Sequence, residues 1–371
     1  MRTPFNESSK AILSSIFRNQ PVSRTVISEL TGFSKATVSN AVDELIKIGL
    51  VEETGNGLAS PNGGPRPIYL SINAGYASVI TIIVRRFLPV VQVDDLMGET
   101  VREYPTGKSA YDDIDELCED LAVCCERAVA DFGADRILGI GMSIAGNVED
   151  NRIINSPISR LTELDLAEMF SSRLGLDTFL ERDVYSMAYG EKWKGVGKTY
   201  DDFTAIWAST GIGSATLIGS NLVRGANGMA GEIGFMTAGS QEIDLQPRTL
   251  NDFGPFESVA SIHNLELKYS DTFEHLVESR SGDPAFREDL NALCDKMAMG
   301  ITNIIVLLNP GAIVINGRLR CAQKLIQEHI EQRLKVMCPV SCRVEYSFLG
   351  QKAITLGGTY LVLNQKLGIT L

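Results

Sequence analysis

The sequence predicts an N-terminal winged helix-turn-helix domain followed by an α/β body of two lobes. Three observations support this. Three short amphipathic segments occupy the first fifty residues. A stretch rich in Gly, Pro, Asn and Ser then separates two short apolar runs. From residue 68 onward, short apolar runs alternate with segments of helical periodicity, which is typical of α/β folds.

The first two amphipathic segments predict helices at 6–19 and 24–30. Asn6 is an N-cap candidate for the first helix, and Pro21 ends it. In the turn at 31–34, Gly32 can adopt the positive φ of a tight interhelical connection. A third helix is expected at 35–48, beginning after Ser34 as its N-cap. Two helices joined by a short glycine turn form a helix-turn-helix motif.

The exposed start of the third helix has the side chains that a recognition helix needs. It carries small or hydrogen-bonding residues, and no acid occurs from Thr31 to Val42. Bulky residues could not approach base edges, and carboxylates would repel phosphates. A generic three-helix bundle explains the helices but not this acid-free stretch. The predicted DNA-binding residues are Arg24, Thr25, Ser34, Lys35, Ala36, Thr37, Ser39, Asn40 and Arg66.

The segment after the third helix predicts a wing. Short strands are expected at 50–53 and 68–70, on either side of the flexible composition of 54–67. Arg66, near the end of this segment, is placed to contact a phosphate or a narrow minor groove. The same composition also fits an interdomain linker, and both interpretations can hold together.

The rest of the chain predicts alternating strands and helices. The strands are expected at 79–84, 90–93, 137–142, 203–207, 215–218 and 312–315, and the helices at 113–132, 161–174, 285–308 and 321–334. Glycine turns are expected at 143–147 and 209–214. We expect the domains to be 1–67 for DNA binding, 68–183 for a first lobe that the C-terminal helix can complete, and 184–371 for a second lobe that binds sugar and dimerises.

Charge and composition limit the function classes. The net charge is −12, yet residues 1–66 carry seven Lys or Arg against six Asp or Glu, so any DNA contact has to come from the N-terminal segment. The seven cysteines include no C-x-x-C pair, which favours reduced thiols over a metal site. No run approaches the ~20 apolar residues of a membrane span. We therefore expect a cytoplasmic protein without a membrane partner.

Several motifs of the body occur in an order that resembles the ROK family of repressors, open reading frames and sugar kinases, and the whole chain resembles its repressor branch. The motifs of the body, in chain order, are Ile140–Asn147, Asn155–Pro157, Glu181–Asp183, Ser209–Gly213, Gly228–Gly234, Asn309–Pro310, Ile315–Gly317 and Leu356–Gly358. On the N-terminal side, the resemblance depends on the helix-turn-helix at Thr25–Gly49 followed by Gly63–Pro67. The resemblance implies an actin-like, ribonuclease-H-like fold that binds sugars in a cleft and commonly forms dimers or tetramers.

The resemblance also implies where ATP would bind in a kinase of the family. The first phosphate loop of those kinases reads D-x-G-G-T, and the stretch that we align with it is Asn73-Ala74-Gly75-Tyr76-Ala77. The acid, one glycine and the threonine are missing, so ATP is not expected as a cofactor. The stretch Lys192–Thr199 superficially resembles a Walker A motif, but Lys192 stands where a glycine is required, and a basic surface turn is the expected structure.

The sugar site that the resemblance implies is only partly retained. Its predicted residues are Gly146, Arg182, Asp183, Glu232, Phe235 and Glu257. Carboxylates suit a polyol because each can accept two hydroxyl hydrogen bonds. However, Arg182 replaces the asparagine and Phe235 the histidine of the family pattern, and the zinc-knuckle region at 241–255 has no cysteine, so no zinc is expected. A degenerate pocket with salt-bridged acids remains the alternative.

These observations favour a sugar-responsive transcriptional regulator, a repressor, whose body is a non-catalytic sugar-kinase fold. Its partners would be operator DNA, a sugar or sugar derivative, and further copies of itself in a homodimer or homotetramer. A dimer would read half-sites one or two turns apart, ~10–21 bp. The alternatives are a sugar kinase with an appended regulatory domain, and a DNA-bound scaffold that senses a protein partner.

Overall fold

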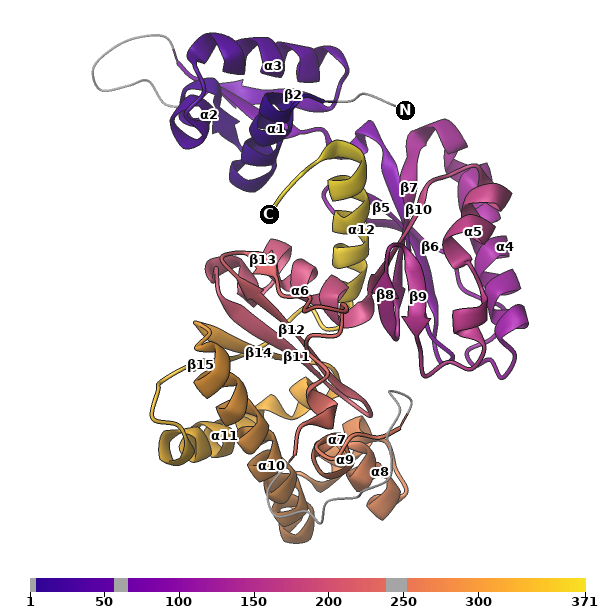
Figure 1. The fold of residues 1–371 in the computed structure, drawn as a ribbon, viewed down its shortest axis with the longest axis vertical. Helices are drawn as coiled ribbons and strands as arrows, with labels where there is room; N and C mark the ends of the chain where they lie inside the picture. Colours follow the sequence, from indigo (N-terminus) through magenta and orange to yellow (C-terminus); the bar gives the residue numbers. More distant parts are fainter. Residues whose placement is uncertain (1–4, 57–65, 238–251) are drawn as a thin grey trace. The chain divides into compact units, whose positions relative to one another are not determined.

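The computed structural model describes residues 5–56, 66–237 and 252–371, and the chain is divided into two compact units (Figure 1). Unit 1 consists of Met1–Ser143, Asp165–Glu181 and Gly358–Leu371. Unit 2 consists of Ile144–Leu164 and Arg182–Gly357.

Three helices open unit 1 as the sequence predicts. They are α1 (Glu7–Asn19), α2 (Arg24–Thr31) and α3 (Lys35–Lys47). The Asn6 side chain accepts a hydrogen bond from the Ser9 amide at 2.8 Å and caps α1. Gly32 ends α2 with φ +72°, and the Ser34 hydroxyl caps α3 by accepting from the Thr37 amide at 3.1 Å. The local signals of capping and turn chemistry therefore fix this helix-turn-helix.

A small sheet completes the winged fold. Its strand order is β1 (Val22–Ser23), β3 (Ile68–Ile72) and β2 (Val51–Asn56). Strands β2 and β3 pair in the antiparallel direction, which confirms the predicted hairpin. The tip of the predicted wing, residues 57–65, lies outside the described residues.

A five-stranded sheet forms the body of unit 1. Its order is β10 (Thr178–Arg182), β7 (Ile137–Ile144), β4 (Ser78–Val84), β5 (Val90–Asp95) and β6 (Thr100–Glu103). Helices α4 (Ile114–Phe132) and α5 (Leu166–Leu174) cover one face, and the second half of α12 (Lys352–Leu367) covers the other (Figure 1). Gly141 makes this second packing possible, since a Cβ there would lie 2.2 Å from the Gly358 carbonyl oxygen.

The C-terminal residues of unit 1 contact the winged domain. The Thr370 amide donates to the Ser14 hydroxyl on α1 at 3.0 Å, and that hydroxyl donates to the Gly368 carbonyl at 3.4 Å. Ile369 is buried, and its carbonyl accepts from the Asn364 side chain. The end of the chain therefore binds α1 directly.

A second five-stranded sheet organises unit 2. Its order is β13 (Asn221–Leu222), β12 (Ile212–Ile218), β11 (Phe203–Ala208), β14 (Ala312–Asn316) and β15 (Arg343–Tyr346). Strands β11, β14 and β15 run parallel to one another, and β12 is antiparallel to β11.

Helices pack on both faces of this sheet. Helix α6 (Asp183–Lys194) contacts β11 and β12. Helices α10 (Pro284–Leu308) and α11 (Gln323–Met337) share a hydrophobic core with Ile206, Ile313 and Ile315 of the sheet. By length and composition, α10 is the one helix among the described residues that could cross a membrane, but half of its most apolar window is buried inside the unit. Burial of that kind is what a core helix shows.

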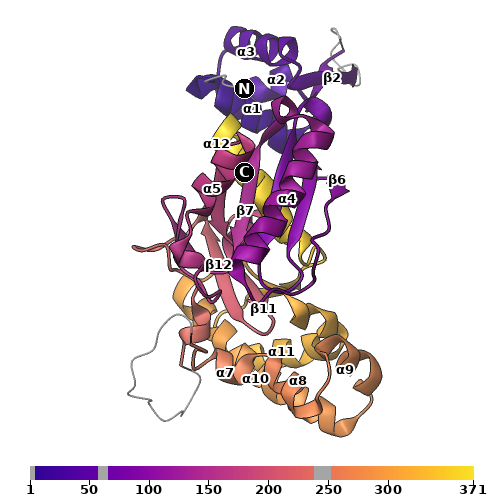
Figure 2. The same ribbon diagram turned by 90° about the vertical axis from the view of Figure 1, so that its right-hand side faces the viewer.

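Shorter elements complete unit 2. Strands β8 (Asn147–Glu149) and β9 (Arg152–Asn155) form a hairpin. Helices α7 (Glu257–Ala260), α8 (His263–Tyr269) and α9 (Phe273–Arg280) lie next to α10 and α11 (Figure 2).

Several predicted boundaries are wrong for local reasons. The helix expected at 161–174 is a 3-10 turn at Leu161–Glu163 followed by α5, because the Asp165 side chain caps a new start by accepting from the Glu168 amide. The glycine turn expected at 209–214 is shorter, since β12 already begins at Ile212. Similarly, α11 begins at Gln323 after a 3-10 turn, two residues later than expected.

Candidate functional site

The start of α3 presents a polar surface on the winged domain. Ser34, Lys35, Ala36 and Asn40 are exposed, whereas Thr37 and Ser39 are partly buried. The Ser34 hydroxyl also lies 2.9 Å from that of Thr37, so these two side chains fix the first turn of the helix. The exposed residues are of the types that read base edges and bind phosphates.

The two predicted arginine contacts are in different surroundings. Arg24 forms ion pairs with Asp43 at 2.9 Å and Glu53 at 3.4 Å, so much of its charge is neutralised within the domain. Thr25, the next residue, is exposed. Arg66 is exposed at the start of the returning wing strand. Arg66 is therefore the stronger phosphate-binding candidate of the two arginines.

Among the predicted sugar-site residues, Arg182 and Glu232 are brought together directly. Arg182 ends β10 just before α6, and its side chain is 5 % exposed. Its Nη2 lies 2.7 Å from Glu232 Oε1, and its Nη1 donates to the Ala230 carbonyl at 3.1 Å. The charge of Glu232 is therefore balanced by an arginine that is almost fully buried.

Tyr185 binds the loop that contains Ala230 and Glu232, and the sequence did not predict this role. Its hydroxyl lies within hydrogen-bond distance of the Gly228 and Ala230 carbonyls, at 3.1 and 2.9 Å. The guanidinium of Arg182 lies over its ring, 5.1 Å from the centroid. Its place in the first turn of α6, three residues after Arg182, was the available signal.

Asp183 and Phe235 lie next to these residues in the chain, one residue after Arg182 and three residues after Glu232. Asp183 is the first residue of α6, and its Oδ1 accepts from the Val184 amide at 2.7 Å. A carboxylate at a helix N-terminus is stabilised by the helix dipole. Phe235 ends a 3-10 turn at Ile233–Phe235 and is partly buried.

Glu257 lies under the turn before β12. Its Oε1 accepts from the Ile212 amide at 2.6 Å, and its Oε2 accepts from the Gly254 amide at 3.4 Å. Burial raises the pKa of Glu257 above its ordinary value, the two amides act against that rise, and the charge of Glu232 adds to it. The carboxylate therefore stabilises the turn before β12, in addition to any contact that it makes with a ligand.

Replacing Glu257 by glutamine tests this burial. An acid whose pKa is raised on folding binds more protons in the folded state, so its contribution to stability decreases as pH rises above its ordinary pKa of about 4.3. The unfolding free energy of the wild type relative to Glu257→Gln should therefore decrease between mildly acidic and neutral pH. Urea unfolding at several pH values measures the difference, and a difference that grows with pH would contradict the burial argument.

Gly146 and Asn147 form the turn into the β8–β9 hairpin. Gly146 has φ +141°, and a Cβ there would lie 2.2 Å from the Asn155 carbonyl oxygen, so only glycine fits. Asn147 is 2 % exposed, and neither polar atom of its side chain has a hydrogen-bond partner among the described residues. Buried amides are normally satisfied, so Asn147 is a ligand-binding candidate that the sequence analysis did not select.

Two other sequence expectations concern phosphate and metal. The stretch Lys192–Thr199 is not a surface turn, because it contains the end of α6 and a 3-10 turn, and Lys192 Nζ donates to the Tyr200 carbonyl at 2.8 Å. Most of the zinc-knuckle region, residues 241–251, lies outside the described residues. Within the described ranges, no group of three or more potential metal ligands occurs.

Two family models match the sequence. The ROK family model matches residues 98–365, and a model for winged helix-turn-helix DNA-binding domains matches residues 5–52. The second match covers the three helices described above and the start of β2. The resemblance inferred from the motifs is thereby confirmed.

Known proteins resemble this chain over 77–97 % of its length. The xylose repressor of Bacillus spizizenii is 30 % identical, over 97 % of this chain and 96 % of its own. The crystal structure of a ROK family transcriptional regulator, a homologue of the E. coli MLC protein, covers 97 % of this chain and 99 % of its own, with a TM-score of 0.76 and 21 % identity. A ROK family glucokinase from Streptomyces griseus, solved with glucose and AMPPNP, covers 77 % of this chain and 99 % of its own, with a TM-score of 0.60 and 22 % identity. With a winged helix-turn-helix domain at its N-terminus, the chain belongs to the ROK family.

Proposed function

We propose that this protein is a sugar-responsive transcriptional repressor of the cytoplasm that binds operator DNA as a dimer. The observation that carries the proposal is that one chain contains both a winged helix-turn-helix domain and a ROK body. The exposed start of α3 offers Lys35, Ala36 and Asn40 to a major groove. Relatives of nearly the same length, 25–30 % identical, are named xylose repressors.

The turns that could hold a triphosphate favour a regulator over an enzyme. Asn73 binds the winged domain, since its side chain donates to the Gly49 carbonyl at 2.9 Å and its amide donates to the Leu50 carbonyl at 3.0 Å. The connection between β4 and β5, residues 85–89, contains two arginines and no glycine. Phosphate loops need glycines so that several backbone amides can face the anion. Incubation with Mg-ATP and a panel of sugars should therefore release no ADP, whereas a kinase would release it.

A neutral sugar is the effector that fits the site residues. The unpartnered amide of Asn147 offers both a donor and an acceptor, and the carboxylates of Asp183 and Glu257 accept from hydroxyls. Neither zinc nor ATP is part of the proposed site. Xylose is the first compound to test, because curated relatives carry its name. A thermal-shift screen of sugars and sugar phosphates, followed by a gel shift with any hit, tests the response.

Operator binding is tested by Lys35→Ala and Arg66→Ala. Each removes an exposed cation from the proposed interface, so each should weaken binding to the protein's own upstream DNA by roughly 5- to 100-fold. Losing a phosphate contact should also reduce the salt dependence of binding. Gel shifts at several salt concentrations measure both effects.

Lys324→Ala provides the matched control, because Lys324 is exposed on α11 in unit 2. Its operator affinity and the melting temperatures of all three variants should match those of the wild type. Unchanged affinity in both Lys35→Ala and Arg66→Ala would disprove the assignment of this surface.

A further inference from the structure

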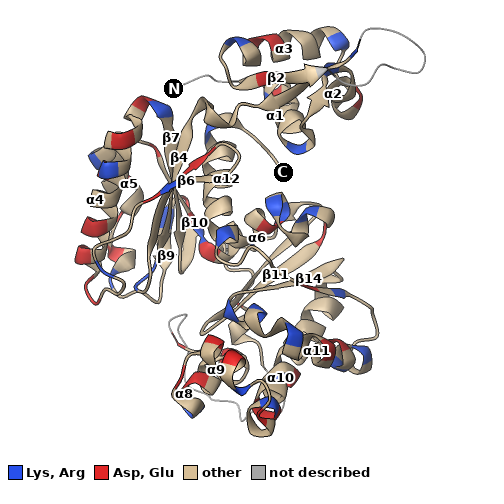
Figure 3. Ribbon diagram, turned by 180° about the vertical axis from the view of Figure 1, so that it is seen from behind, with Lys and Arg blue, Asp and Glu red and all other residues tan. Residues whose placement is uncertain are grey.

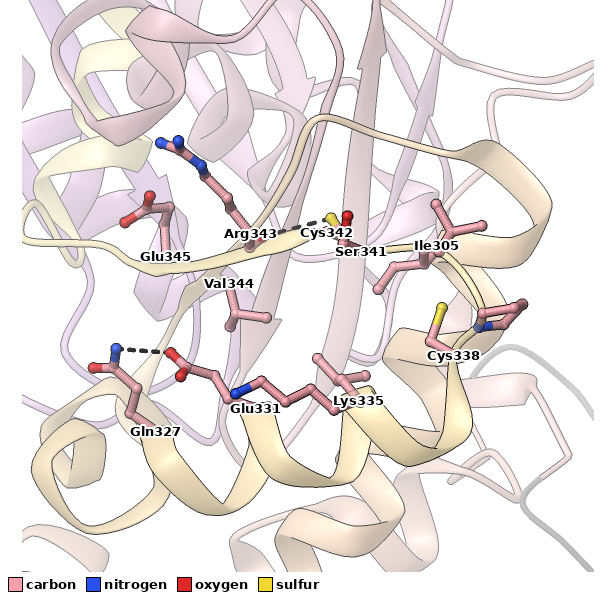
Figure 4. A pocket seen from close by; sticks show the side chains of 13 residues that line it. Ile305, Gln327, Glu331, Lys335, Cys338, Ser341, Cys342, Arg343, Val344 and Glu345 are labelled. Carbon is pink, nitrogen blue, oxygen red and sulfur yellow. Dashed lines mark hydrogen bonds between the residues drawn. The ribbon is translucent and has the colours of Figure 1, made fainter.

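Two cavities in unit 2 differ in the polarity of their walls. The larger, of about 650 Å³, lies between α11, the following loop and the edge strand β15 (Figure 4). Its walls carry Glu331 and Lys335 from α11, and Arg343 and Glu345 from β15. Acidic and basic residues are likewise mixed along α11 as a whole (Figure 3). Charged walls of this kind favour water over an apolar molecule.

The smaller cavity, of about 260 Å³, has mainly apolar walls. It lies between the second half of α10, the strands β11 and β12, and the segment at 230–236. We call this space the α10 cavity, and its larger apolar side chains are those of Val223, Ile233, Met236, Ile304, Leu307 and Leu308. Apolar surface that lines a cavity is stabilised by an apolar molecule that fills it.

The hydroxyls that the sheet contributes to the α10 cavity are engaged within the protein. Thr204 Oγ1 and Thr216 Oγ1 lie 2.9 Å apart, so they bond to each other across β11 and β12. The Ser214 hydroxyl donates to the Gly231 carbonyl at 3.3 Å. A water molecule needs about two to four polar partners to remain in a cavity. These walls therefore suit an apolar molecule better than water.

The exposed residues of the lining mark the mouth of the α10 cavity. Asn303 and Leu307 are exposed, and they lie four residues apart on one face of α10. The Asn303 amide can bond to one polar group of a ligand at this position. Met236 is partly buried in the opposing segment, and its unbranched side chain can adapt to the shape of a ligand.

We propose that the α10 cavity binds a small apolar molecule, with one or two aromatic rings or an alkyl chain of that size, and at most one polar group at the mouth. An apolar cavity of about 150 Å³ binds benzene. The α10 cavity, at about 260 Å³, has room for two fused rings. This ligand class goes beyond the proposed function, because its binding requires neither a sugar nor DNA.

The α10 cavity shares one wall with the candidate sugar-site residues of unit 2. Ala230 and Gly231 line the cavity and directly precede Glu232 in the chain. The Ala230 carbonyl also accepts hydrogen bonds from Arg182 and Tyr185, at 3.1 and 2.9 Å. A molecule in the cavity therefore contacts the same segment that carries Glu232, which gives unit 2 a second ligand site beside the first.

Indole is the probe, and methionine methyl signals locate it. The full chain contains ten methionines, of which Met236 lines the α10 cavity. Indole, added without sugar or DNA, should shift the Met236 methyl resonance through its ring current and leave that of Met142, buried in unit 1, in place. Met236→Leu assigns the signal. Benzoate should not shift it, because its charge would be desolvated in the cavity.

Two substitutions that reduce the space test the location. Val223→Trp and Leu308→Trp enlarge partly buried side chains on two different walls, so each should weaken indole binding at least ~10-fold. Thermal shift measures the affinity. Indole at about ten times its dissociation constant should raise the wild-type melting temperature by roughly 2–4 °C.

Val340→Trp is the matched control, because Val340 lines the larger cavity and is 42 % exposed. This variant should bind indole like the wild type. A Met236 signal that does not move up to the solubility limit of indole would overturn the proposal, and that measurement needs no variant that reduces the cavity. Folded Val223→Trp and Leu308→Trp proteins with wild-type affinity would also overturn it, as would a loss of binding in Val340→Trp alone.

Discussion

Replacing Gly357 by alanine is expected to destabilise the protein by about 3 kcal/mol. Gly357 is in α12, where alanine normally stabilises a helix by up to ~1 kcal/mol. Here the added Cβ would lie 1.9 Å from the Ser186 carbonyl oxygen of α6, and no side-chain rotation relieves a contact with backbone. On the same pair of helices, a Cβ at Gly190 would lie 1.9 Å from the Ala353 carbonyl oxygen. The two helices therefore depend on glycines for their close approach.

The neighbouring glycine supplies the control. A Cβ at Gly358 would meet its nearest atoms at 3.5 Å, which is ordinary van der Waals contact. Gly358→Ala should therefore be neutral or slightly stabilising, whereas Gly357→Ala should lower the melting temperature by roughly 6–12 °C. Calorimetry compares them, and equal melting temperatures for the two variants would show that α6 and α12 do not pack in this way.

The close packing of α12 also matters for regulation. Residues Lys352–Gly357 of this helix belong to unit 2, and the rest of α12 and the C-terminal residues belong to unit 1. Beyond α12, Thr370 binds Ser14 of the winged domain. Inside unit 1, the Thr359 hydroxyl donates to the buried carboxylate of Asp94 at 2.9 Å, which fixes the helix to the sheet. Helix α12 and the residues that follow it thus form a continuous segment that begins in unit 2, which holds the candidate ligand residues, and ends on the winged domain.

Local signals made the winged domain predictable. Asn6, Gly32 and Ser34 act within a few residues of their own positions, so their roles can be read from the sequence. A C-terminal helix was expected to complete the first lobe, but the bounds of α12 were not predicted, since its apolar residues are buried on several sides and leave no amphipathic stripe. Strands β6, β8, β9 and β13 were also missed, because at two to four residues they are too short for a periodic signal.

The candidate site was only partly predictable, because its contacts are long-range. Motif order identified Arg182 and Glu232 as site residues, but their ion pair joins positions fifty residues apart. The unpartnered state of Asn147 depends on what surrounds it in the folded chain, and the sequence carries no sign of it. Residue identity therefore indicated the chemistry available, and the fold decided which groups neutralise one another.

Replacing Arg182 by methionine is expected to cost about 2–3 kcal/mol of stability. Breaking a buried ion pair typically costs 3–5 kcal/mol, because the remaining charge has no partner. The Glu232 side chain is 27 % exposed, so water compensates part of that loss and the expected cost is lower. Urea unfolding of unit 2, followed by the fluorescence of Trp193 and Trp207, measures it.

The double variant decides whether the cost comes from the unpaired charge. Arg182→Met with Glu232→Leu leaves neither charge buried, so it should be more stable than Arg182→Met alone. Arg280→Met breaks an exposed ion pair with Asp283 and should cost at most ~1 kcal/mol. If Arg182→Met is as mild as Arg280→Met, the loop at 224–234 is held by Tyr185 and by packing. If it is severe and the double variant recovers, Arg182 fixes Glu232 in place, and the hydroxyls of a sugar have to be met by Asn147, Asp183 and Glu257 instead.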